Sequence, residues 1–516
     1  MTMNFAWKIF RSAYIFIAIY ILIATAYTAS AQSGEGCKHR LADAINSYQP
    51  AIVPVCDLFG RVLYFDRKLH PENTDGTRDT DEIWVSKKLA GQGWSVPRRI
   101  DGPLNTPGAD VLFSLSPDAG SALVYGKYTG LAGSKDRGFS IARNIDGQWD
   151  DPRPLEIEDF YNLSSQFYGC LSYDGRTLVM ALERRDGYGR MDIYVSFFNK
   201  YKNNWTEPLN LGDAINTDGI EATACLAWDN RTLYFASGGR DDSFGKMDLY
   251  MSRRLDDTWR NWSKPVNLGP AINSEGDDSG LWPMALADTV FFVSQDSLTA
   301  RDGIYMGCLA DSLRPLPYRV IYGDLLRGAD SMKFIGDVKI LLSSGGEELQ
   351  SLVLSSGEYA IVAPADRTAD LRFTAIGYRP VEIALGEIDA KLPVMERRDA
   401  VFNPEKLEKE LIDKLYFDTD SVEISQISKK KLINKLKSLD NYPKKDYVIV
   451  GHADQRGEDK YNLILSMKRA QSVGRYLLSQ GIPLSNIKMQ WQGEREPASD
   501  QNSLNRRVEI YILNQK

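Results

Sequence analysis

The sequence predicts a multidomain, β-rich protein. An all-β propeller is followed by a small β-sandwich and then by an α/β domain whose helices and sheet are arranged as an α+β sandwich. Three observations lead to this prediction: a motif that recurs four times in the first half, short alternating strands in the middle, and a buried strand followed by a long amphipathic helix near the C-terminus. At about 150 residues per domain, 516 residues correspond to three or four domains. Hydrophobic residues make up 43% of the chain and charged residues 25%, as in ordinary globular proteins.

The first 31 residues have the pattern of an export signal. Lys8 and Arg11 precede an apolar run from Ala13 to Ala26, and Ala29-Ser30-Ala31 has the small-x-small pattern of a cleavage site. We therefore expect residues 1–31 to be a signal peptide and the mature chain to begin near Gln32. An uncleaved anchor helix is the alternative.

The cysteine content suits an exported protein with at least one unpaired thiol. Five is an odd number, and disulfides form in oxidising compartments. We expect Cys37 to pair with Cys56, and we expect Cys170 and Cys225, which occupy equivalent strand positions, to be small core residues. Residues 34–36 lack the apolar residues of a lipid-attachment site, so no lipid is expected on Cys37.

Four copies of Trp-x-x-Pro divide the first half of the chain into repeating units. Their tryptophans follow one another at intervals of 55, 56 and 57 residues, which is typical of a repeat architecture. The copies are Trp94 to Pro97, Trp149 to Pro152, Trp205 to Pro208 and Trp262 to Pro265.

Each unit contains four short strands and no helical periodicity. The segments Leu171 to Leu178 and Leu226 to Leu233 align with each other and carry Asp-Gly and Asp-Asn between apolar runs, as hairpin turns do. Four strands per unit predict a propeller blade. Residues 37–318 would then hold five blades, or six if short end blades close the ring, with a degenerate last unit from Leu281 to Cys308.

These units, with Ser116-Pro117-Asp118 in the second, resemble the PD40-type, WD40-like β-propeller repeat. We expect the tryptophans to wedge between blades rather than to bind sugar, because they recur in every unit. Acidic loop residues are expected to stabilise turns, and calcium binding is the alternative. These residues are Asp186, Asp192, Asp241 and Asp248.

Residues 319–395 predict a small β-sandwich. The phrases Ile321 to Asp324, Gly357 to Ile361 and Ala375 to Pro380 resemble the carboxypeptidase regulatory-like fold, a resemblance that implies no catalytic residue. The expected strands are Val338 to Leu342, Leu349 to Leu354, Tyr359 to Val362 and Leu371 to Ala375.

Near the C-terminus, a pattern of charged residues follows a buried strand. The apolar run from Tyr447 to Val450 delivers Asp454 to a strand-to-helix turn, and a helix is expected from Glu458 to Gln480. On that helix Asn462, Ser466 and Arg469 form a polar stripe beside an apolar one, so we expect one face to pack and the adjacent face to bind. A carboxylate and a guanidinium a few ångströms apart suit a zwitterion.

Residues 403–516 resemble the OmpA-like peptidoglycan-binding domain. The opening strand is Leu415 to Ser421, the core motif is Gly451 to Gly457 with the helix that follows, and the closing strand is Asn505 to Ile510. The resemblance implies that Asp454 holds the ammonium of a meso-diaminopimelate side chain and Arg469 its carboxylate. It also implies that the pocket is lined by Asn462, Asp418, Asp420 and Ser421.

Two departures and one alternative accompany this assignment. Ala453 stands where the family has threonine, and the segment between Pro497 and Asn505 is shorter than usual. The alternative is that Asp454 only caps the following helix and Arg469 only pairs with it.

Charge and missing motifs narrow the function. From Asn403 onward the chain has 20 Lys and Arg against 16 Asp and Glu, a net charge of +4, which leaves −11 for the rest. A mildly basic anchor suits an anionic cell-wall polymer, and no nucleic-acid partner is expected. No catalytic motif occurs, and the three histidines are too scattered for a metal site. We therefore expect neither an enzyme nor a cofactor.

The order of the modules resembles envelope proteins of Bacteroidota, including an accessory component of the type IX secretion and gliding machinery. It implies a non-enzymatic scaffold in the periplasm, associated with the outer membrane and the cell wall, with protein partners on the propeller. The relatives' usual tetratricopeptide repeats have no room here. The alternative is a propeller enzyme, a glycosidase or lyase, acting on envelope glycans.

Overall fold

The computed structural model describes residues 37–47, 50–90, 93–128, 135–145, 147–285, 288–295, 301–328, 331–334, 337–354, 357–375, 377–404, 409–494 and 496–513. The predicted signal peptide, residues 1–31, and the expected start at Gln32 lie outside the described residues. The chain divides into two compact units. The first comprises Met1–Val320, Ile361–Asp366 and Ile388–Met395, and the second comprises Ile321–Ala360, Arg367–Glu387 and Glu396–Lys516.

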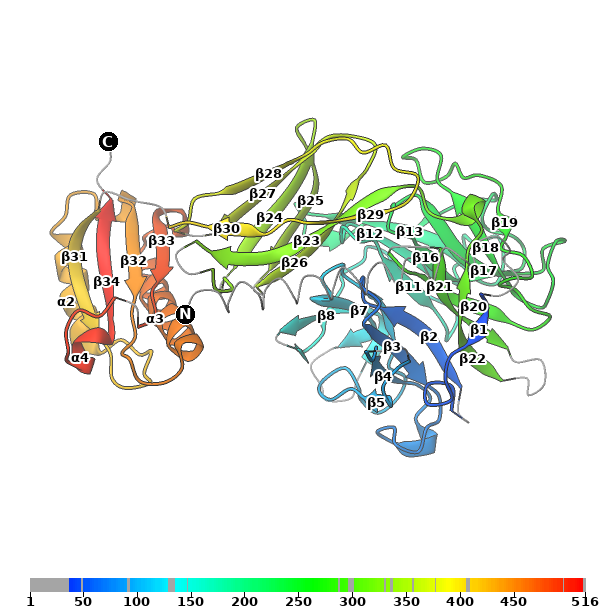
Figure 1. Cartoon of the computed structure of the whole chain (residues 1–516), viewed down its shortest axis with the longest axis horizontal. Coiled ribbons are helices and arrows are strands. Elements are labelled where there is room, and N and C mark those ends of the chain that lie inside the picture. The colour runs from blue at the N-terminus through cyan, green and yellow to red at the C-terminus, as the bar shows by residue number, and fades with distance from the viewer. Residues whose placement is uncertain are drawn as a thin grey trace, which may run out of the picture. The chain divides into compact units, whose positions relative to one another are not determined.

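Five separate antiparallel sheets occupy the chain up to Cys308 (Figure 1). The first has β2 (Ala51–Cys56), β3 (Val62–Arg67), β4 (Glu82–Lys87) and β5 (Arg98–Arg99), and the second has β6 (Leu112–Leu115), β7 (Ser121–Tyr128), β8 (Lys135–Ile145), β9 (Gln148–Trp149) and β10 (Arg153–Pro154). The third has β11 (Tyr168–Leu171), β12 (Thr177–Leu182), β13 (Asp192–Asn199), β14 (Asn204–Trp205) and β15 (Leu209–Asn210). The fourth has β16 (Ile220–Leu226), β17 (Thr232–Gly238), β18 (Asp248–Arg253) and β19 (Val266–Asn267), and the fifth has β20 (Asp278–Pro283), β21 (Thr289–Gln295), β22 (Asp302–Cys308) and β1 (His39–Arg40).

Hairpins lie where the turn residues predict them. Gly175, between β11 and β12, has a φ of 69°, and Asn230, between β16 and β17, has a φ of 57°. Glycine and asparagine tolerate this left-handed conformation better than other residues. Asp174 closes the first of these turns by accepting hydrogen bonds from the Ser172 hydroxyl and the Arg176 N–H.

The first strands of the five sheets contact one another in a cycle: β2 with β6, β6 with β11, β11 with β16, β16 with β20, and β20 with β2. In four places a recurring asparagine ties a connecting loop to a strand. Asn216 accepts from Ile193 N at 2.7 Å and donates to Ile193 O at 3.0 Å. Asn46, near the start of the described chain, makes the same pair of bonds with Ile304 of β22, so the beginning of the chain completes the last sheet.

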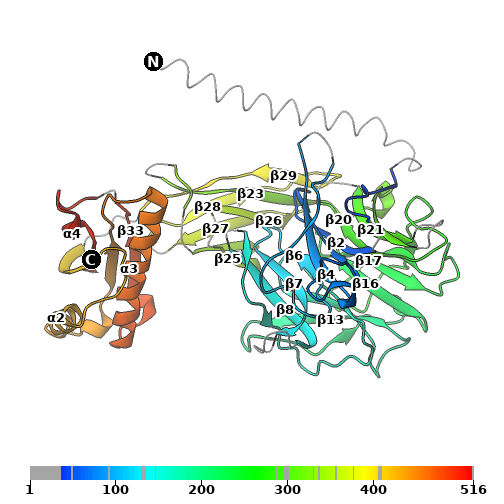
Figure 2. The ribbon, with the colours of Figure 1, turned by 90° about the horizontal axis from the view of Figure 1, so that it is seen from below.

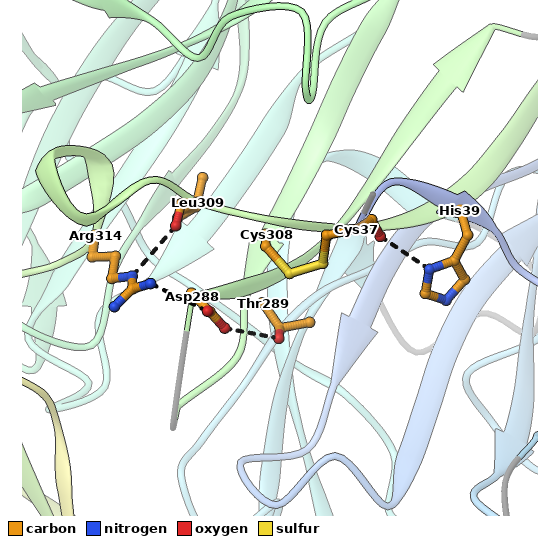
Figure 3. The surroundings of a disulfide bond; sticks show 7 residues. All are labelled: Cys37, His39, Asp288, Thr289, Cys308, Leu309 and Arg314. Atoms are coloured by element: carbon orange, nitrogen blue, oxygen red, sulfur yellow. Dashed lines mark hydrogen bonds and ion pairs between the residues drawn. A yellow bond between two sulfur atoms is a disulfide. The ribbon is translucent and has the colours of Figure 1, made fainter. Parts of the chain in front are cut away.

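The expected disulfide between Cys37 and Cys56 is wrong. Cys37 is bonded to Cys308, 271 residues away (Figure 3). The reason is the register of the fifth sheet, in which His39 lies opposite Met306 and therefore brings Cys37 beside the end of β22. Cys56 is a buried free thiol at the end of β2.

The recurring tryptophans pack against the sheet that precedes their own. The ring of Trp149, in the second sheet, lies 6.1 Å from that of Tyr64 in the first. Trp94 follows the third strand of the first sheet, and its ring lies 6.0 Å from that of Phe291 in the fifth. Trp205 and Trp262 are buried among residues of the second and third sheets respectively. This packing agrees with the predicted wedge between neighbouring sheets.

The middle of the chain forms two further sheets, and all four strands predicted there are present. One sheet contains β23 (Tyr318–Arg327), β26 (Glu358–Pro364), β29 (Val394–Arg397) and β30 (Ala400–Phe402). The other contains β24 (Val338–Ser344), β25 (Glu347–Leu354), β27 (Ala369–Ala375) and β28 (Val381–Leu385).

The C-terminal domain has one mixed sheet in the order β31 (Lys409–Tyr416), β34 (Arg507–Leu513), β32 (Tyr447–Gly451) and β33 (Ile487–Trp491). The helices are α2 (Gln426–Lys437), α3 (Asp459–Ser479) and the short α4 (Asn502–Asn505). Figure 2 shows α3 lying alongside β33. Both long helices pack on the sheet through one core that joins Leu432 of α2 and Val473 of α3 to Ile449.

Helix α3 begins and ends within one residue of the predicted limits. Gly481, with a φ of 86°, follows its C-terminus, and Pro483 comes two residues later. Among the helices that the structure describes, none combines the length and the apolar character needed to cross a bilayer.

Candidate functional site

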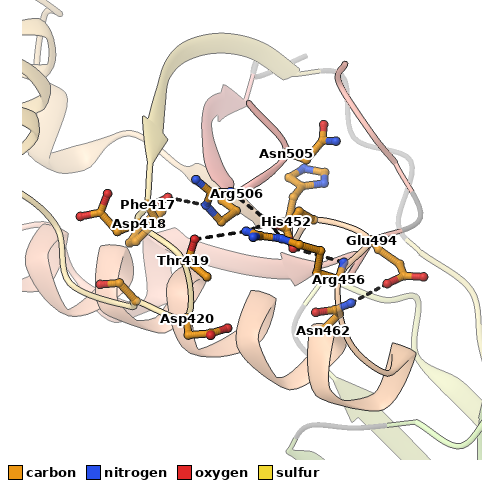
Figure 4. A network of polar contacts seen from close by, with 12 residues as sticks. Phe417, Asp418, Thr419, Asp420, His452, Arg456, Asn462, Glu494, Asn505 and Arg506 are labelled. Atoms are coloured by element: carbon orange, nitrogen blue, oxygen red, sulfur yellow. Dashed lines mark hydrogen bonds and ion pairs between the residues drawn. The ribbon is translucent and has the colours of Figure 1, made fainter. Parts of the chain in front are cut away.

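Loops at the carboxyl end of β32 form the candidate site (Figure 4). Past the strand, His452 N donates to Arg507 O at 2.8 Å and Ala453 N donates to Gly493 O at 2.7 Å. These two bonds hold the loop against its neighbours and present Asp454 at its end. The loop after β31, residues 417–421, lies across from it, because Arg506 Nε donates to Phe417 O at 3.0 Å.

Asp454 is a buried carboxylate between two guanidinium groups. It accepts from Arg456 Nη2 at 2.7 Å and from Arg506 Nη1 at 3.0 Å, and only 6% of the residue is exposed. Burial by itself would raise the pKa of Asp454, but the hydrogen bonds from Arg456 and Arg506 outweigh it and hold that pKa below its usual value. The carboxylate therefore stays charged at neutral pH.

Arg469 is completely buried and bonds to backbone carbonyls. Its Nε donates to Ser421 O at 2.9 Å, its Nη1 to His452 O at 3.1 Å and its Nη2 to Asp418 O at 3.2 Å. Burial lowers its pKa to about 10, with Asp454 opposing the shift, so the group remains a cation. Arg469 thus ties the 418–421 turn to the loop that carries Asp454.

The predicted polar stripe of α3 does not face solvent. Asn462, Ser466 and Arg469 are all buried. The reason is that loops cover this face: Gly493 N donates to the Ser466 hydroxyl at 3.1 Å, and Asn462 Nδ2 donates to Glu494 Oε2. The face that was expected to bind is therefore covered by loops 418–421 and 493–494, and it stays a predicted binding face.

Asp418, Asp420 and Ser421 form the turn that Arg469 holds. Asp418 and Asp420 are exposed, and Asp420 has a φ of 55°. Asp420 Oδ1 accepts from the Tyr461 hydroxyl at 3.1 Å, and the Thr419 hydroxyl accepts from Arg456 at 3.1 Å. The structure thus gathers all six residues predicted for the site at one end of the sheet.

His452 lies beneath these loops and packs rather than binds. It is 1% exposed, and burial lowers its pKa, so the ring is neutral near pH 7. Its Nε2 is 3.6 Å from Glu509 Oε2. Bonds to His452, Tyr511, Arg507 and Lys414 hold the pKa of Glu509 well below its usual value.

The sequence interpretation assigned no role to Arg456 and Arg506, although both lie in the motifs that carried it. Arg456 is two residues beyond Asp454, and Arg506 opens the closing strand, so their position in the motifs was the available signal. The alternative, in which Asp454 only caps α3 and pairs with Arg469, does not hold. The N-cap of α3 is Glu458, whose side chain makes no capping hydrogen bond, and Asp454 bonds to Arg456 and Arg506.

Across the described residues, no three His, Cys, Asp or Glu side chains gather in a way that could hold a metal ion.

Comparisons with known proteins concern this same part of the chain. The OmpA family matches residues 416–510. The peptidoglycan-associated lipoprotein of Agrobacterium fabrum is 37% identical over 87 residues, which are 17% of this chain and 49% of that protein. Outer membrane protein A of Shimwellia blattae is 48% identical over 69 residues, 13% of this chain and 28% of that protein. This chain therefore spans half or less of the length of these relatives.

A solved structure gives a match of the same extent. The peptidoglycan-associated lipoprotein from Burkholderia pseudomallei is 29% identical, and the match covers 19% of this chain and 88% of that one with a TM-score of 0.18. By the family match, the β-rich chain carries a C-terminal domain of the OmpA family at residues 416–510.

Proposed function

We propose that this protein is a non-enzymatic scaffold of the bacterial envelope that holds peptidoglycan through residues 403–516. The observation that carries the proposal is the buried carboxylate of Asp454 with guanidinium groups around it, in a domain whose family relatives include proteins named for their association with peptidoglycan. A buried charge is costly unless it is paired, so a fixed cluster of this kind is typical of a recognition site.

The ligand that best fits is the free end of a meso-diaminopimelate side chain. It carries an ammonium and a carboxylate on one carbon, and the site places the buried carboxylate of Asp454 beside the guanidinium groups of Arg456, Arg469 and Arg506. Asp454 would take the ammonium. Arg469 uses three of its five N–H groups on backbone carbonyls, so two remain for the ligand carboxylate, with Arg506 beside it. Asn462, Asp418, Asp420 and Ser421 would line the pocket.

Arg456 would compete with the ligand ammonium. Its side chain is 53% exposed and bonds to the same Oδ2 of Asp454 that an ammonium would use. Because an exposed ion pair contributes little, a ligand can displace this side chain at low cost. Arg506 is 14% exposed and is also held by Phe417 O, so it would stay in place when the ligand binds.

Co-sedimentation of residues 403–516 with diaminopimelate-type peptidoglycan tests the site. Asp454→Asn keeps the shape and removes the charge, and Arg469→Ala removes the guanidinium. We expect each to weaken binding ten- to hundredfold, because a charge-assisted hydrogen bond contributes roughly 1.5 to 3 kcal/mol. Arg456→Ala should bind as well as the unchanged domain or more tightly.

Two controls make the result specific. Arg475→Ala removes an exposed guanidinium from the same helix and should leave sedimentation unchanged. Peptidoglycan with lysine in place of diaminopimelate keeps the ammonium and lacks the carboxylate, so it should bind more weakly. If folded Asp454→Asn protein sedimented like the unchanged domain, the site assignment would be wrong.

For the N-terminal region, the proposal is a five-bladed β-propeller over residues 37–318 that binds protein partners, followed by a regulatory-like β-sandwich over residues 319–395. The cycle of contacts between the first strands of the five sheets supports it. The protein would lie in the periplasm, against the cell wall and the outer membrane. No observation favours the glycan-cleaving alternative, and a role in type IX secretion or gliding stays a prediction from the order of modules.

A further inference from the structure

Two free cysteines meet between the third and fourth sheets. Cys170 lies on β11 and Cys225 on β16, the first strands of neighbouring sheets. Their Sγ atoms are 3.7 Å apart, and the residues are 2% and 6% exposed. Neither belongs to the disulfide that the structure contains. The pair is separated by 55 residues in sequence, so it is a tertiary contact rather than a local one.

The backbone beside Cys225 is irregular in a way that directs its side chain. The pairing of β16 with β17 shifts register between Ala222 and Cys225, and Thr223 within this bulge has a φ of 44°. A β-branched residue pays for this conformation, and such strain persists only where the surroundings hold it. The Thr223 hydroxyl is held by Gly280 N at 3.0 Å. Bulges of this kind re-aim the side chains that follow them.

A small cavity borders the two thiols. Cys170 and Cys225 both line a space of about 30 Å³, together with apolar residues such as Phe113 and Trp282. A space of this size holds a molecule as small as water. Hydrogen peroxide is only slightly larger than water and suits a space of this size, whereas a bulky disulfide reagent does not.

The two thiols are electrostatically unequal. The hydrogen bond that joins them lowers the pKa of Cys170, against the effect of burial, and raises that of Cys225. The thiolate is the reactive form of cysteine, so the directions of these two pKa shifts favour Cys170 as the first of the pair to react.

We propose that Cys170 and Cys225 form a redox pair that closes to a second intramolecular disulfide, with hydrogen peroxide as the oxidant. The Cys170 thiolate attacks one peroxide oxygen, the O–O bond breaks, and the leaving hydroxide takes up a proton to become water. The Cys225 sulfur then attacks the sulfenic acid on Cys170 and displaces its oxygen as a second water. Two thiols lose two electrons and two protons, and one peroxide gains them.

Closure would join the first strands of neighbouring sheets covalently. A cross-link between residues this far apart in sequence restricts the unfolded chain. The unfolding temperature of the closed form should therefore be higher by about 5 to 10 °C. The N-terminal region would then contain two disulfides at different places, Cys37–Cys308 in the fifth sheet and Cys170–Cys225 between the third and fourth sheets.

The test counts free thiols in the full-length chain before and after exposure to hydrogen peroxide. The protein is denatured, labelled with a maleimide and weighed, and its peptides are mapped. Starting from three free thiols, we expect one label after oxidation and a cross-linked peptide that contains Cys170 and Cys225. Protein that already carries one label as purified, with the same cross-link, supports the proposal equally.

Single variants provide matched controls. Cys56→Ser removes the third free thiol, which is buried with its Sγ 3.9 Å from Asp57 Oδ1, and should leave closure intact. Cys170→Ser should abolish closure and the rise in unfolding temperature. Three labels after oxidation, a sulfinic acid on Cys170 without a bond to Cys225, or a cross-link only between molecules would each overturn the proposal.

Discussion

Buried polar side chains are arranged differently in the five N-terminal sheets and in the C-terminal domain. In the sheets they recur: Asp192 accepts from Gly189 N at 3.1 Å and from Asn210, and Asp248 accepts from Gly245 N at 3.1 Å and from Asn267. In the C-terminal domain, Asp454, Arg469 and Arg506 gather once, at one end of one sheet.

The difference separates polar groups that stabilise their own loops from the polar groups of the proposed binding site. A carboxylate that accepts bonds from its own loop in each repeat stabilises that loop and needs no ligand. The single cluster around Asp454 does not recur in this way. The predicted turn-stabilising role of Asp192 and Asp248 agrees with these bonds, and no calcium ligand set is found among the described residues.

The largest expected effect comes from removing a tryptophan that joins two sheets. Trp205→Ala should lower the free energy of unfolding of the N-terminal region by about 3 to 5 kcal/mol, because a buried indole leaves a cavity. Urea unfolding measures this. Tyr201→Ala, at a position 89% exposed and four residues earlier, is the control and should have almost no effect.

Peptidoglycan binding should survive the tryptophan substitution. The C-terminal domain has its own sheet and its own core, so we expect co-sedimentation of the full chain to be unchanged wherever it remains folded. Loss of binding in the folded Trp205→Ala protein would mean that the C-terminal domain does not bind peptidoglycan independently of the N-terminal region.

A smaller effect is expected for a repeated asparagine. Asn216→Ala removes both hydrogen bonds to Ile193 and leaves a buried N–H and C=O without them, which should cost about 1 to 3 kcal/mol of unfolding free energy. Asp213→Ala, on the exposed side of the same loop, serves as the control. Equal stability of the two variants would show that the repeated asparagines do not hold the sheets together.

The smallest effect is a pH dependence of opposite sign in the two regions. Burial raises the pKa of Asp79 to about 6 and that of Asp81 above its usual value, so protonation favours the folded N-terminal region. The contribution of Asp79 is present at low pH and is lost as pH rises through about 6. In the C-terminal domain burial lowers the pKa of His452, so its contribution is present above about pH 6.5 and is lost as pH falls.

Hydrogen exchange with mass spectrometry, run on the full chain in urea at pH 7.5 and pH 5, follows peptides of each region separately. From pH 7.5 to pH 5 the N-terminal peptides should gain protection and the C-terminal peptides should lose it. The Asp79→Asn variant should weaken the first trend and His452→Gln the second. Parallel trends in the two regions would contradict the assignment of these groups.

Local patterns predicted the elements well. The hairpins around Gly175 and Asn230, the strands of the middle sheets and the ends of α3 are where the sequence places them, because turn chemistry and hydrophobic period act over a few residues. The OmpA-like domain was predicted over residues 403–516 from three motifs in order, and the family match covers residues 416–510 within that range.

Predictions that depend on distant partners fared less well. The nearest cysteine was chosen for Cys37, whereas its partner is Cys308, because β1 joins the fifth sheet. The polar stripe of α3 was expected to form a binding face, and loops 418–421 and 493–494 cover it. Helical spacing shows which side chains share a face and says nothing of what lies on that face.

The sequence by itself therefore determined the β-rich character and the repeat, which follow from local spacing, and the resemblance of three motifs to a known family predicted the C-terminal domain and six residues of its site. The tertiary structure alone decided which chain segment completes the fifth sheet, that Cys170 lies against Cys225, and that Asp454 is paired with Arg456 and Arg506. Such pairings depend on how sheets and loops far apart in sequence meet, and that geometry is set by the packing of the whole domain.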